Sequence, residues 1–155
     1  MKRGTDQRGF TLIEIIVAFV IISMAAALVG PAIDAGLRQR DVRSAVRTIA
    51  GAVKTLQGDA IQTGKVQELI LDPEDNALYV VGREDRLEFP DSVSFGRIEA
   101  GIMEPDGAGR VRFYPNGSTG GLSLIVGDPE APIEDAFYVQ VDPLIGSVTV
   151  GDIPQ

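Results

Sequence analysis

Glu14 stands at the front of a long apolar run and is the first side chain whose position calls for chemistry. From Ile15 to Ile33 there are 19 residues without a formal charge, about the length that crosses the hydrocarbon core of a bilayer as a helix. A charged side chain in such a segment is costly, so it is expected to have a task and a partner of opposite charge. The flank before the run is short and basic, as is typical of a segment kept in the cytoplasm.

The residues around this carboxylate form a contiguous motif, Gly9-Phe10-Thr11-Leu12-Ile13-Glu14. The motif resembles the processing site of type IV pilins and type II secretion pseudopilins. The resemblance implies a prepilin peptidase that cuts between Gly9 and Phe10 and methylates the new amine of Phe10. It also implies that Glu14 acts in assembly, and it matches Pro31 to a helix-breaking proline near the end of the apolar run.

Two other interpretations of this segment remain open. A secretory signal peptide has an apolar core of roughly 7–15 residues and a small-residue cleavage site, which 25–27, three alanines, could supply. This run is longer, and a signal peptide has no use for Glu14. An uncut signal anchor is the second alternative.

Composition limits the chemistry of the remaining chain. The sequence has 155 residues, no Cys and no His, so disulfides, thiolate metal sites and the usual acid–base and nucleophilic constellations are missing. Residues 1–65 carry 9 basic and 5 acidic side chains, a net of +4, whereas 66–155 carry 5 basic and 17 acidic, a net of −12. The acidic part is a poor candidate for nucleic acid, whose phosphates need Lys and Arg. We expect neither an enzyme nor a cofactor.

Four segments follow from these patterns: a cleaved cytoplasmic leader at 1–9, a transmembrane and assembly helix at 10–33, an amphipathic helix at 34–64 and a periplasmic β domain at 65–155. Pro31 is expected to bend or loosen the helix. The amphipathic part has an apolar stripe at spacings of three and four, made of Val42, Val46, Ile49, Val53, Leu56 and Ala60. Its basic residues, Arg38, Arg40, Arg43, Arg47 and Lys54, form either a solvated face or a surface that meets acidic neighbours.

About eight short segments with strand character follow the helix, separated by turn signals. They are 66–71, 77–81, 86–89, 93–98, 110–114, 122–126, 137–141 and 147–150. The spacing favours antiparallel sheets or a sandwich. The predicted fold class is therefore α+β, with one long N-terminal helix docked on an antiparallel β domain.

Two stretches of the β region carry a closer resemblance. Residues 113–121, Phe-Tyr-Pro-Asn-Gly-Ser-Thr-Gly-Gly, predict a strand, a turn and the next strand. They are similar to the Phe-x-Pro-x-Gly pattern of the H-type minor pseudopilins, the GspH/FimT group, and residues 138–148 resemble the final hairpin of that group.

Two acidic clusters raise the possibility of calcium: Asp72, Glu74 and Asp75, and then Asp128, Glu130, Glu134 and Asp135. Neither has EF-hand spacing. Solvated turns are the expected state, and no metal site is predicted.

The resemblance implies a minor pseudopilin of a type II secretion system, held in the inner membrane and then assembled at or near the tip of a periplasmic pseudopilus. Its implied partners are the prepilin peptidase, other minor and major pseudopilins and the inner-membrane assembly platform. The alternatives are a minor type IV pilin (FimT-like) in pilus assembly or DNA uptake, and an envelope enzyme on a signal anchor. DNA uptake requires a basic surface, whereas residues 142–155 contain no Lys or Arg.

Processing at the Gly9/Phe10 junction is directly testable. A small residue fits a peptidase that must approach the backbone closely, so Gly9→Val is expected to leave the leader attached. The measurement is the electrophoretic mobility of wild type and variant in cells that contain the peptidase. Equal, processed mobility of the two proteins would contradict the prediction.

Overall fold

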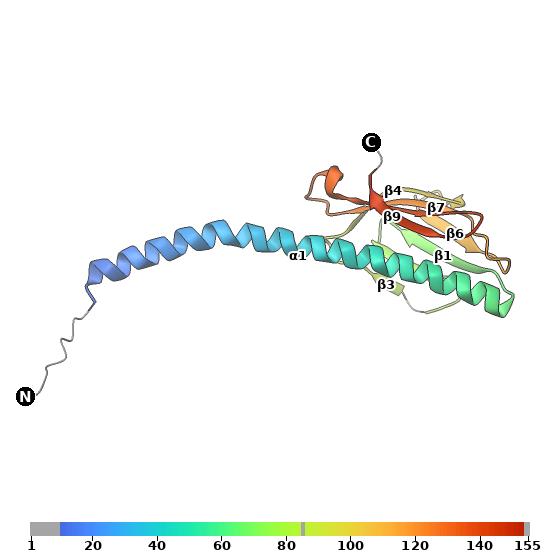
Figure 1. Cartoon of the computed structure of the whole chain (residues 1–155), viewed down its shortest axis with the longest axis horizontal. Helices are drawn as coiled ribbons and strands as arrows, with labels where there is room; N and C mark the ends of the chain where they lie inside the picture. The colour runs from blue at the N-terminus through green and yellow to red at the C-terminus, as the bar shows by residue number, and fades with distance from the viewer. Residues whose placement is uncertain (1–9, 85, 154–155) are drawn as a thin grey trace, which may run out of the picture. The chain divides into compact units, whose positions relative to one another are not determined.

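The computed structural model describes residues 10–84 and 86–153 (Figure 1). The predicted leader, including Gly9, lies outside the described residues. The chain divides into two compact units, Met1–Leu37 and Arg38–Gln155, which are described separately. The helix α1, Leu12–Thr63, contributes to both.

The first unit consists of the beginning of α1. The large apolar side chains that are described in it are exposed; they are Phe10, Leu12, Ile13, Ile15, Ile16, Val17, Phe19, Val20, Ile21, Ile22, Met24, Ile33 and Leu37. The helix assignment runs through Pro31, but the side chain of this proline is outside the description, so the predicted bend is not tested. Among the described residues, no helical stretch combines the length and apolarity that a membrane crossing requires.

In the second unit, α1 is an amphipathic helix with one buried side. All six residues of the predicted stripe, from Val42 to Ala60, are buried, and Ala45 lies with them. The helix ends at Thr63, and Gly64 follows with a φ of 67°. The amide of Gly64 donates to the carbonyl of Ala60 at 3.0 Å. A glycine in this left-handed conformation is a common helix end, as the sequence predicts.

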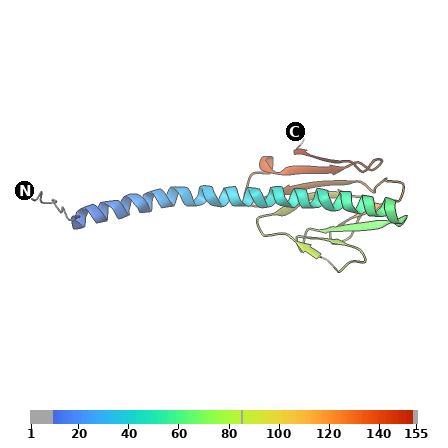
Figure 2. The ribbon, with the colours of Figure 1, turned by 60° about the horizontal axis from the view of Figure 1, so that its bottom comes forward.

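In the part of the chain that the structure describes, nine antiparallel strands form two sheets. The first has the order β3-β2-β1-β6-β5, with β1 Gln67–Asp72, β2 Ala77–Val80, β3 Arg86–Glu88, β5 Ile102–Met103 and β6 Gly109–Phe113. The second has the order β4-β7-β8-β9, with β4 Ser94–Ala100, β7 Leu122–Gly127, β8 Phe137–Val141 and β9 Val148–Asp152; the 3-10 helix η1, Ile133–Asp135, precedes β8. In Figure 2, strands of the two sheets appear on either side of the second half of α1.

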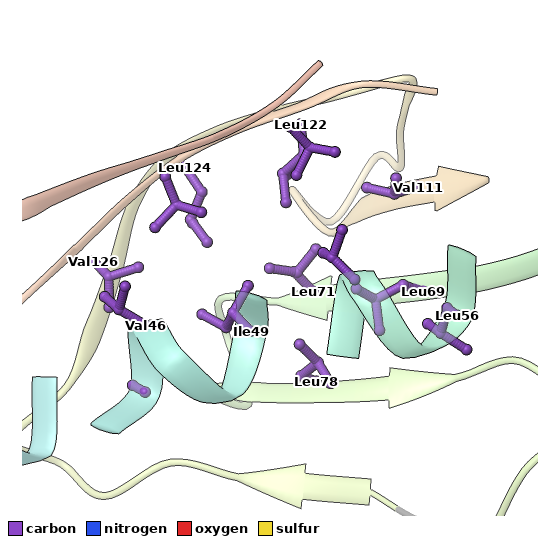
Figure 3. Close-up of a cluster of buried hydrophobic side chains, with 14 of the residues drawn as sticks. Val46, Ile49, Leu56, Leu69, Leu71, Leu78, Val111, Leu122, Leu124 and Val126 are labelled. Atoms are coloured by element: carbon purple, nitrogen blue, oxygen red, sulfur yellow. The ribbon is translucent and has the colours of Figure 1, made fainter. Parts of the chain in front are cut away.

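One hydrophobic core joins this half of α1 to both sheets. Figure 3 shows Val46, Ile49 and Leu56 of the helix pointing toward the side chains of the strands. The strands contribute Leu69, Leu71, Leu78, Val111, Phe113, Leu122, Leu124, Val126, Val139 and Val141. The sheets approach closely where β6 meets β4: a Cβ added to Gly109 would lie only 2.6 Å from Cγ2 of Ile98. Glycine is required there.

The structure confirms the predicted fold class and most of the strand positions. The hairpin of β1 and β2 and the final hairpin of β8 and β9 are both present. The two-residue strand β5 was missed, because two residues carry no periodicity. The stretch at 113–121 does join one strand to the next, but β6 and β7 belong to different sheets, so it is a crossover between the layers.

A ladder of charges holds β1 against β6 on the outer face of the first sheet. Glu68 lies opposite Arg112 and accepts hydrogen bonds from Arg112 Nε at 2.7 Å and Arg110 Nη1 at 2.9 Å. Arg110 also donates to Glu104 at 3.0 Å. The bonds from Arg112 and Arg110 lower the pKa of Glu68 below its ordinary value, against the opposing effect of partial burial.

This ladder predicts an acid-sensitive part of the folding stability. A carboxyl whose pKa is lowered by folding stabilises the native state above its unfolded pKa, and this contribution is lost as the pH falls through the lowered native pKa. Glu68→Gln is therefore expected to reduce stability at pH 7 and to flatten its decline toward low pH. The measurement is chemical denaturation of the full chain between pH 7 and pH 3. Glu99→Gln is the matched control, because the carboxylate of Glu99 takes part in none of the ion pairs of the described residues. Identical pH profiles for the two variants would contradict the prediction.

Candidate assembly site

Thr11 and Glu14 define the start of α1. Thr11 precedes the first helical residue, and its Oγ1 accepts a hydrogen bond from the amide of Glu14 at 3.3 Å. The order Thr-x-x-Glu is that of a capping box, in which the threonine satisfies an orphan amide of the first turn. A carboxylate in the first turn also complements the positive end of the helix dipole. Glu14 thus has a local role in starting the helix.

The side chain of Glu14 lies in an apolar surface groove. The groove has a volume of about 390 Å³ and is lined by Phe10, Glu14, Ile15, Ala18, Phe19 and Ile22. Phe10 is 80% exposed, and although it precedes the first helical residue it lines this groove together with Glu14. The predicted site residues Phe10 and Glu14 are therefore brought together, whereas Gly9 and the side chain of Pro31 are outside the described residues.

This arrangement has a clear physical consequence. The apolar surface around Glu14 is large enough that exposure to water is unfavourable, and whatever covers it must also accommodate a carboxylate. No ion pair of Glu14 occurs among the described residues. A covering surface that is apolar and carries one cation would satisfy both demands.

Residues 113–121 and the hairpin at 138–148, the two stretches noted in the sequence of the β region, meet at the C-terminal end of α1. Gln57 donates from Nε2 to the carbonyl of Gly117 at 2.7 Å and to the carbonyl of Ile145 at 2.9 Å. Thr119 completes the junction, because its amide donates to the carbonyl of Pro143 at 2.8 Å. Residues 113–121 and the loop between β8 and β9 are therefore fixed to each other and to the helix.

Beside this junction, three apolar side chains are exposed. They are Ile61, Leu144 and Ile145, of which Leu144 is the most exposed at 80%. Ile61 belongs to the last turn of α1, and Leu144 and Ile145 belong to the loop between β8 and β9. Nothing in the described chain covers them.

The acidic clusters act in turns and ion pairs. Oδ1 of Asp72 accepts from the amides of Glu74 and Asp75, and Asp128 accepts from the amide of Glu130. The described residues contain no group of three or more potential metal ligands. Arg38 pairs with Glu130 at 3.1 Å and with Asp128 at 3.7 Å, so this member of the basic set meets an acidic surface of its own chain.

Sequence reasoning missed two residues of these sites. The capping role of Thr11 could have been found, because Thr-x-x-Glu before an apolar run is a recognised helix start. Gln57 carries no such signal. It lies beside the buried stripe on the helix, and its two acceptors are 60 and 88 residues away.

Comparisons with known proteins agree with this geometry. The family model of the prokaryotic N-terminal methylation motif matches residues 4–30. The type II secretion system protein H of Xanthomonas campestris pv. campestris is 26% identical over 148 residues, which cover 94% of this chain and 84% of that protein. The crystal structure of the type IV minor pilin FimU of Pseudomonas aeruginosa has a TM-score of 0.52 and 8% identity, and the match covers 70% of this chain and 91% of that one. At this identity the likeness to FimU concerns the fold alone.

A long helix with a methylation motif, packed on antiparallel sheets, defines a pilin-like structural protein and not an enzyme. The chain carries the N-terminal methylation motif and is similar over most of its length to a type II secretion protein H, and its fold is like that of a type IV minor pilin. Its motif implies processing by a prepilin peptidase, and its family implies partners in a pilus-like fibre.

The junction made by Gln57 predicts a loss of stability on substitution. Gln57→Ala removes the donor to two carbonyls and is expected to destabilise the second unit by about 1–3 kcal/mol. Gln57→Glu keeps the shape but cannot donate when ionised, so its loss should be at least as large. Chemical denaturation of the full chain measures both. Thr55→Ala, at an exposed position of the same helix, should change stability by less than about 0.5 kcal/mol, and a Gln57→Ala value as small as this control would contradict the prediction.

Proposed function

We propose that this chain is a minor pseudopilin of a type II protein secretion system. Its leader would be cut after Gly9, Phe10 would be N-methylated, and the protein would then join the periplasmic pseudopilus that helps export folded proteins. The likeness to a type II secretion protein H over most of both chains supports this class. The observation that carries the proposal is Glu14, a single carboxylate in an exposed apolar groove within the methylation motif.

Before assembly, the protein would be held in the inner membrane by residues 10–33. Its N-terminus would face the cytoplasm, in keeping with the basic residues Lys2, Arg3 and Arg8, and its β domain would lie in the periplasm. Recruitment into the fibre would involve the inner-membrane assembly platform and the other minor and major pseudopilins.

The mechanism of assembly follows from the surroundings of Glu14. In a fibre of packed apolar helices, an unpaired charge costs several kcal/mol, so the carboxylate requires a cation. Cleavage after Gly9 creates one at the amine of Phe10. Within one chain that amine would lie just before the start of α1, four residues from Glu14, so only the amine of an adjacent subunit would form a pair that links two subunits.

The need of Glu14 for a cation also bears on the place of the subunit in the fibre. A subunit at the extreme tip has no subunit above it against which to place an amine, so its carboxylate would be dispensable. This chain has Glu14. We therefore place it at or near the tip, beneath another minor subunit. Cysteine cross-linking along the helix tests this, and cross-links only to subunits below it would contradict the placement.

A minor type IV pilin in pilus assembly or DNA uptake is the second candidate, favoured by the fold of FimU. DNA binding is disfavoured by the net charge of −12 over residues 66–155. Three arginines of the strands are also engaged with carboxylates. Arg86 pairs with Asp75, and both Arg110 and Arg112 pair with Glu68. A duplex DNA gel shift at micromolar protein and physiological salt would support this candidate over the first.

Replacement of Glu14 tests the proposal. Glu14→Ala is expected to leave processing and membrane insertion intact, because a carboxylate near the edge of a bilayer has a modest cost. It should reduce incorporation into pseudopili at least about tenfold, because the neighbour's amine loses its partner among apolar helices. The measurement is the amount of variant in sheared fibres relative to the membrane, together with secretion of substrate.

Ser23→Ala is the matched control within the same apolar segment. The hydroxyl of Ser23 donates to the carbonyl of Phe19 at 2.8 Å in its own helix, so its removal strands no partner and incorporation should be unchanged. Wild-type incorporation of Glu14→Ala would contradict the proposed role, and so would an equal loss in both variants.

A further inference from the structure

The strand β9 has a free edge. It lies at the end of its sheet and pairs only with β8. The amide of Asp142 donates to the carbonyl of Ser147 at 2.9 Å, and bonded pairs alternate along an antiparallel ladder. By this alternation, the backbone N–H and C=O groups of Val148 and Val150 point away from β8. Such a row of unpaired groups is a template for another strand.

An apolar groove runs beside this edge. It has a volume of about 280 Å³ and is lined by Arg43, Val46, Arg47 and Ala50 of α1, Phe137 of β8 and Val150 of β9. Val150 lies opposite Val139 in the ladder, so both face the same side of the sheet. Yet Val139 is fully buried, whereas Val150 is 44% exposed. The groove is thus a place where the core side of the sheet is left uncovered at its edge.

The size of the groove favours side chains over a small molecule. Pockets for drug-sized ligands have volumes of about 300–1,000 Å³ and enclose most of the ligand. This groove is smaller and open along β9, so it fits a few side chains of an extended segment.

The charges on the rim indicate which side chains these are. Arg43 and Arg47 are four residues apart on α1, so they lie on one side of the helix. Both are exposed, and neither takes part in an ion pair among the residues that the structure describes. Arg38, by contrast, is satisfied by Asp128 and Glu130. Asp152 ends β9 but does not line the groove.

We propose that a neighbouring subunit of a different sequence docks here by adding an extended segment to the edge of β9. Its apolar side chains would enter the groove against Val46 and Val150, and its acidic side chains would pair with Arg43 and Arg47. This inference rests on the proposed function, which supplies neighbouring subunits. A second copy of this chain fits less well, because none of its described edge strands offers two carboxylates without an arginine. Strands β3 and β4 carry Arg86 and Arg97 beside their glutamates, β5 is uncharged, and β9 has only Asp152.

Peptide binding to the full chain in detergent micelles tests this inference separately from assembly in cells. The probes are two fluorescein-labelled ten-residue peptides in which every second residue is Ser and the other positions alternate Val with Glu in one peptide and Val with Lys in the other, so that both kinds of side chain face the groove. Fluorescence anisotropy should give an affinity for the Val/Glu peptide about tenfold higher than for the Val/Lys peptide. Equal affinities, or no binding of the Val/Glu peptide at millimolar concentration, would overturn the inference. The proposed function would still stand if Glu14→Ala lowers incorporation into pseudopili in cells as expected.

Two sets of variants separate the backbone and charge contributions. Val150→Pro removes the N–H that would bond to the added strand, and proline is tolerated on an edge, so binding should be lost. Val150→Thr keeps the N–H and should bind. Arg43→Glu with Arg47→Glu should reverse the preference between the peptides, whereas Lys54→Glu, an exposed residue of α1 outside the groove, should not.

The remaining outcomes also decide the question. Retained binding by Val150→Pro would show that the peptide does not extend the sheet, which overturns the inference. So would an unchanged preference in the double arginine variant. Sedimentation that reveals a dimer of the chain, abolished by Val150→Pro, would assign the edge to a second copy and contradict the proposed partner.

Discussion

Burial of one stripe of α1, from Val42 to Ala60, is the interaction on which the β domain depends. The stripe forms one core with both sheets, and neither sheet buries its apolar face without it. The helix and the domain therefore form a single folded unit from Arg38 onward. Any force on this part of the helix acts directly on the sheets.

Around this core, polar side chains of the helix hold the loops. Gln57 fixes the crossover and the final hairpin, Arg38 pairs with the loop after β7, and Asp41 accepts a hydrogen bond from Ser92 at 2.7 Å. Asn76 acts similarly inside the domain, since its side-chain amide donates to the carbonyl of Val93 at 2.8 Å while its backbone holds a φ of 47°. Contacts of this kind give the exposed loops defined positions on the outer surface, which a subunit that meets different neighbours requires.

The early part of α1 differs from the second half in what it exposes. Its described large apolar side chains are exposed, and Glu14, the carboxylate at their front, is without an ion pair in the described chain. A subunit that polymerises through its helix has two physical requirements. Its domain must bury its own core, and its helix must keep an apolar segment that another subunit can cover.

Much of this architecture could be predicted from the sequence, because it rests on local periodicity. The stripe at spacings of three and four located the buried side of α1, and Gly64 located its end. Turn residues located eight of the nine strands within about two residues. The motif at Gly9–Glu14 supplied the family, because it is a contiguous pattern that the comparisons confirm.

The contacts between distant segments could not be predicted. Which strands share a sheet depends on the core, so the stretch at 113–121 could be placed between two strands but not recognised as a crossover between sheets. The groove beside β9 depends on where Arg43 and Val150 meet, and they are 107 residues apart in the chain. Periodicity placed Arg43 and Arg47 off the buried stripe, and only the fold places them beside a free strand edge.

We propose that Glu14 is neutralised by the amine of Phe10 on an adjacent subunit. Cryo-electron microscopy of a reconstituted fibre that contains this chain measures the distance between the carboxylate and that amine directly. We expect the carboxylate of Glu14 to lie within about 4 Å of the Phe10 amine of the adjacent subunit, which is the range of an ion pair. A carboxylate that pairs with the amine of its own chain, or that faces only apolar side chains, would contradict it.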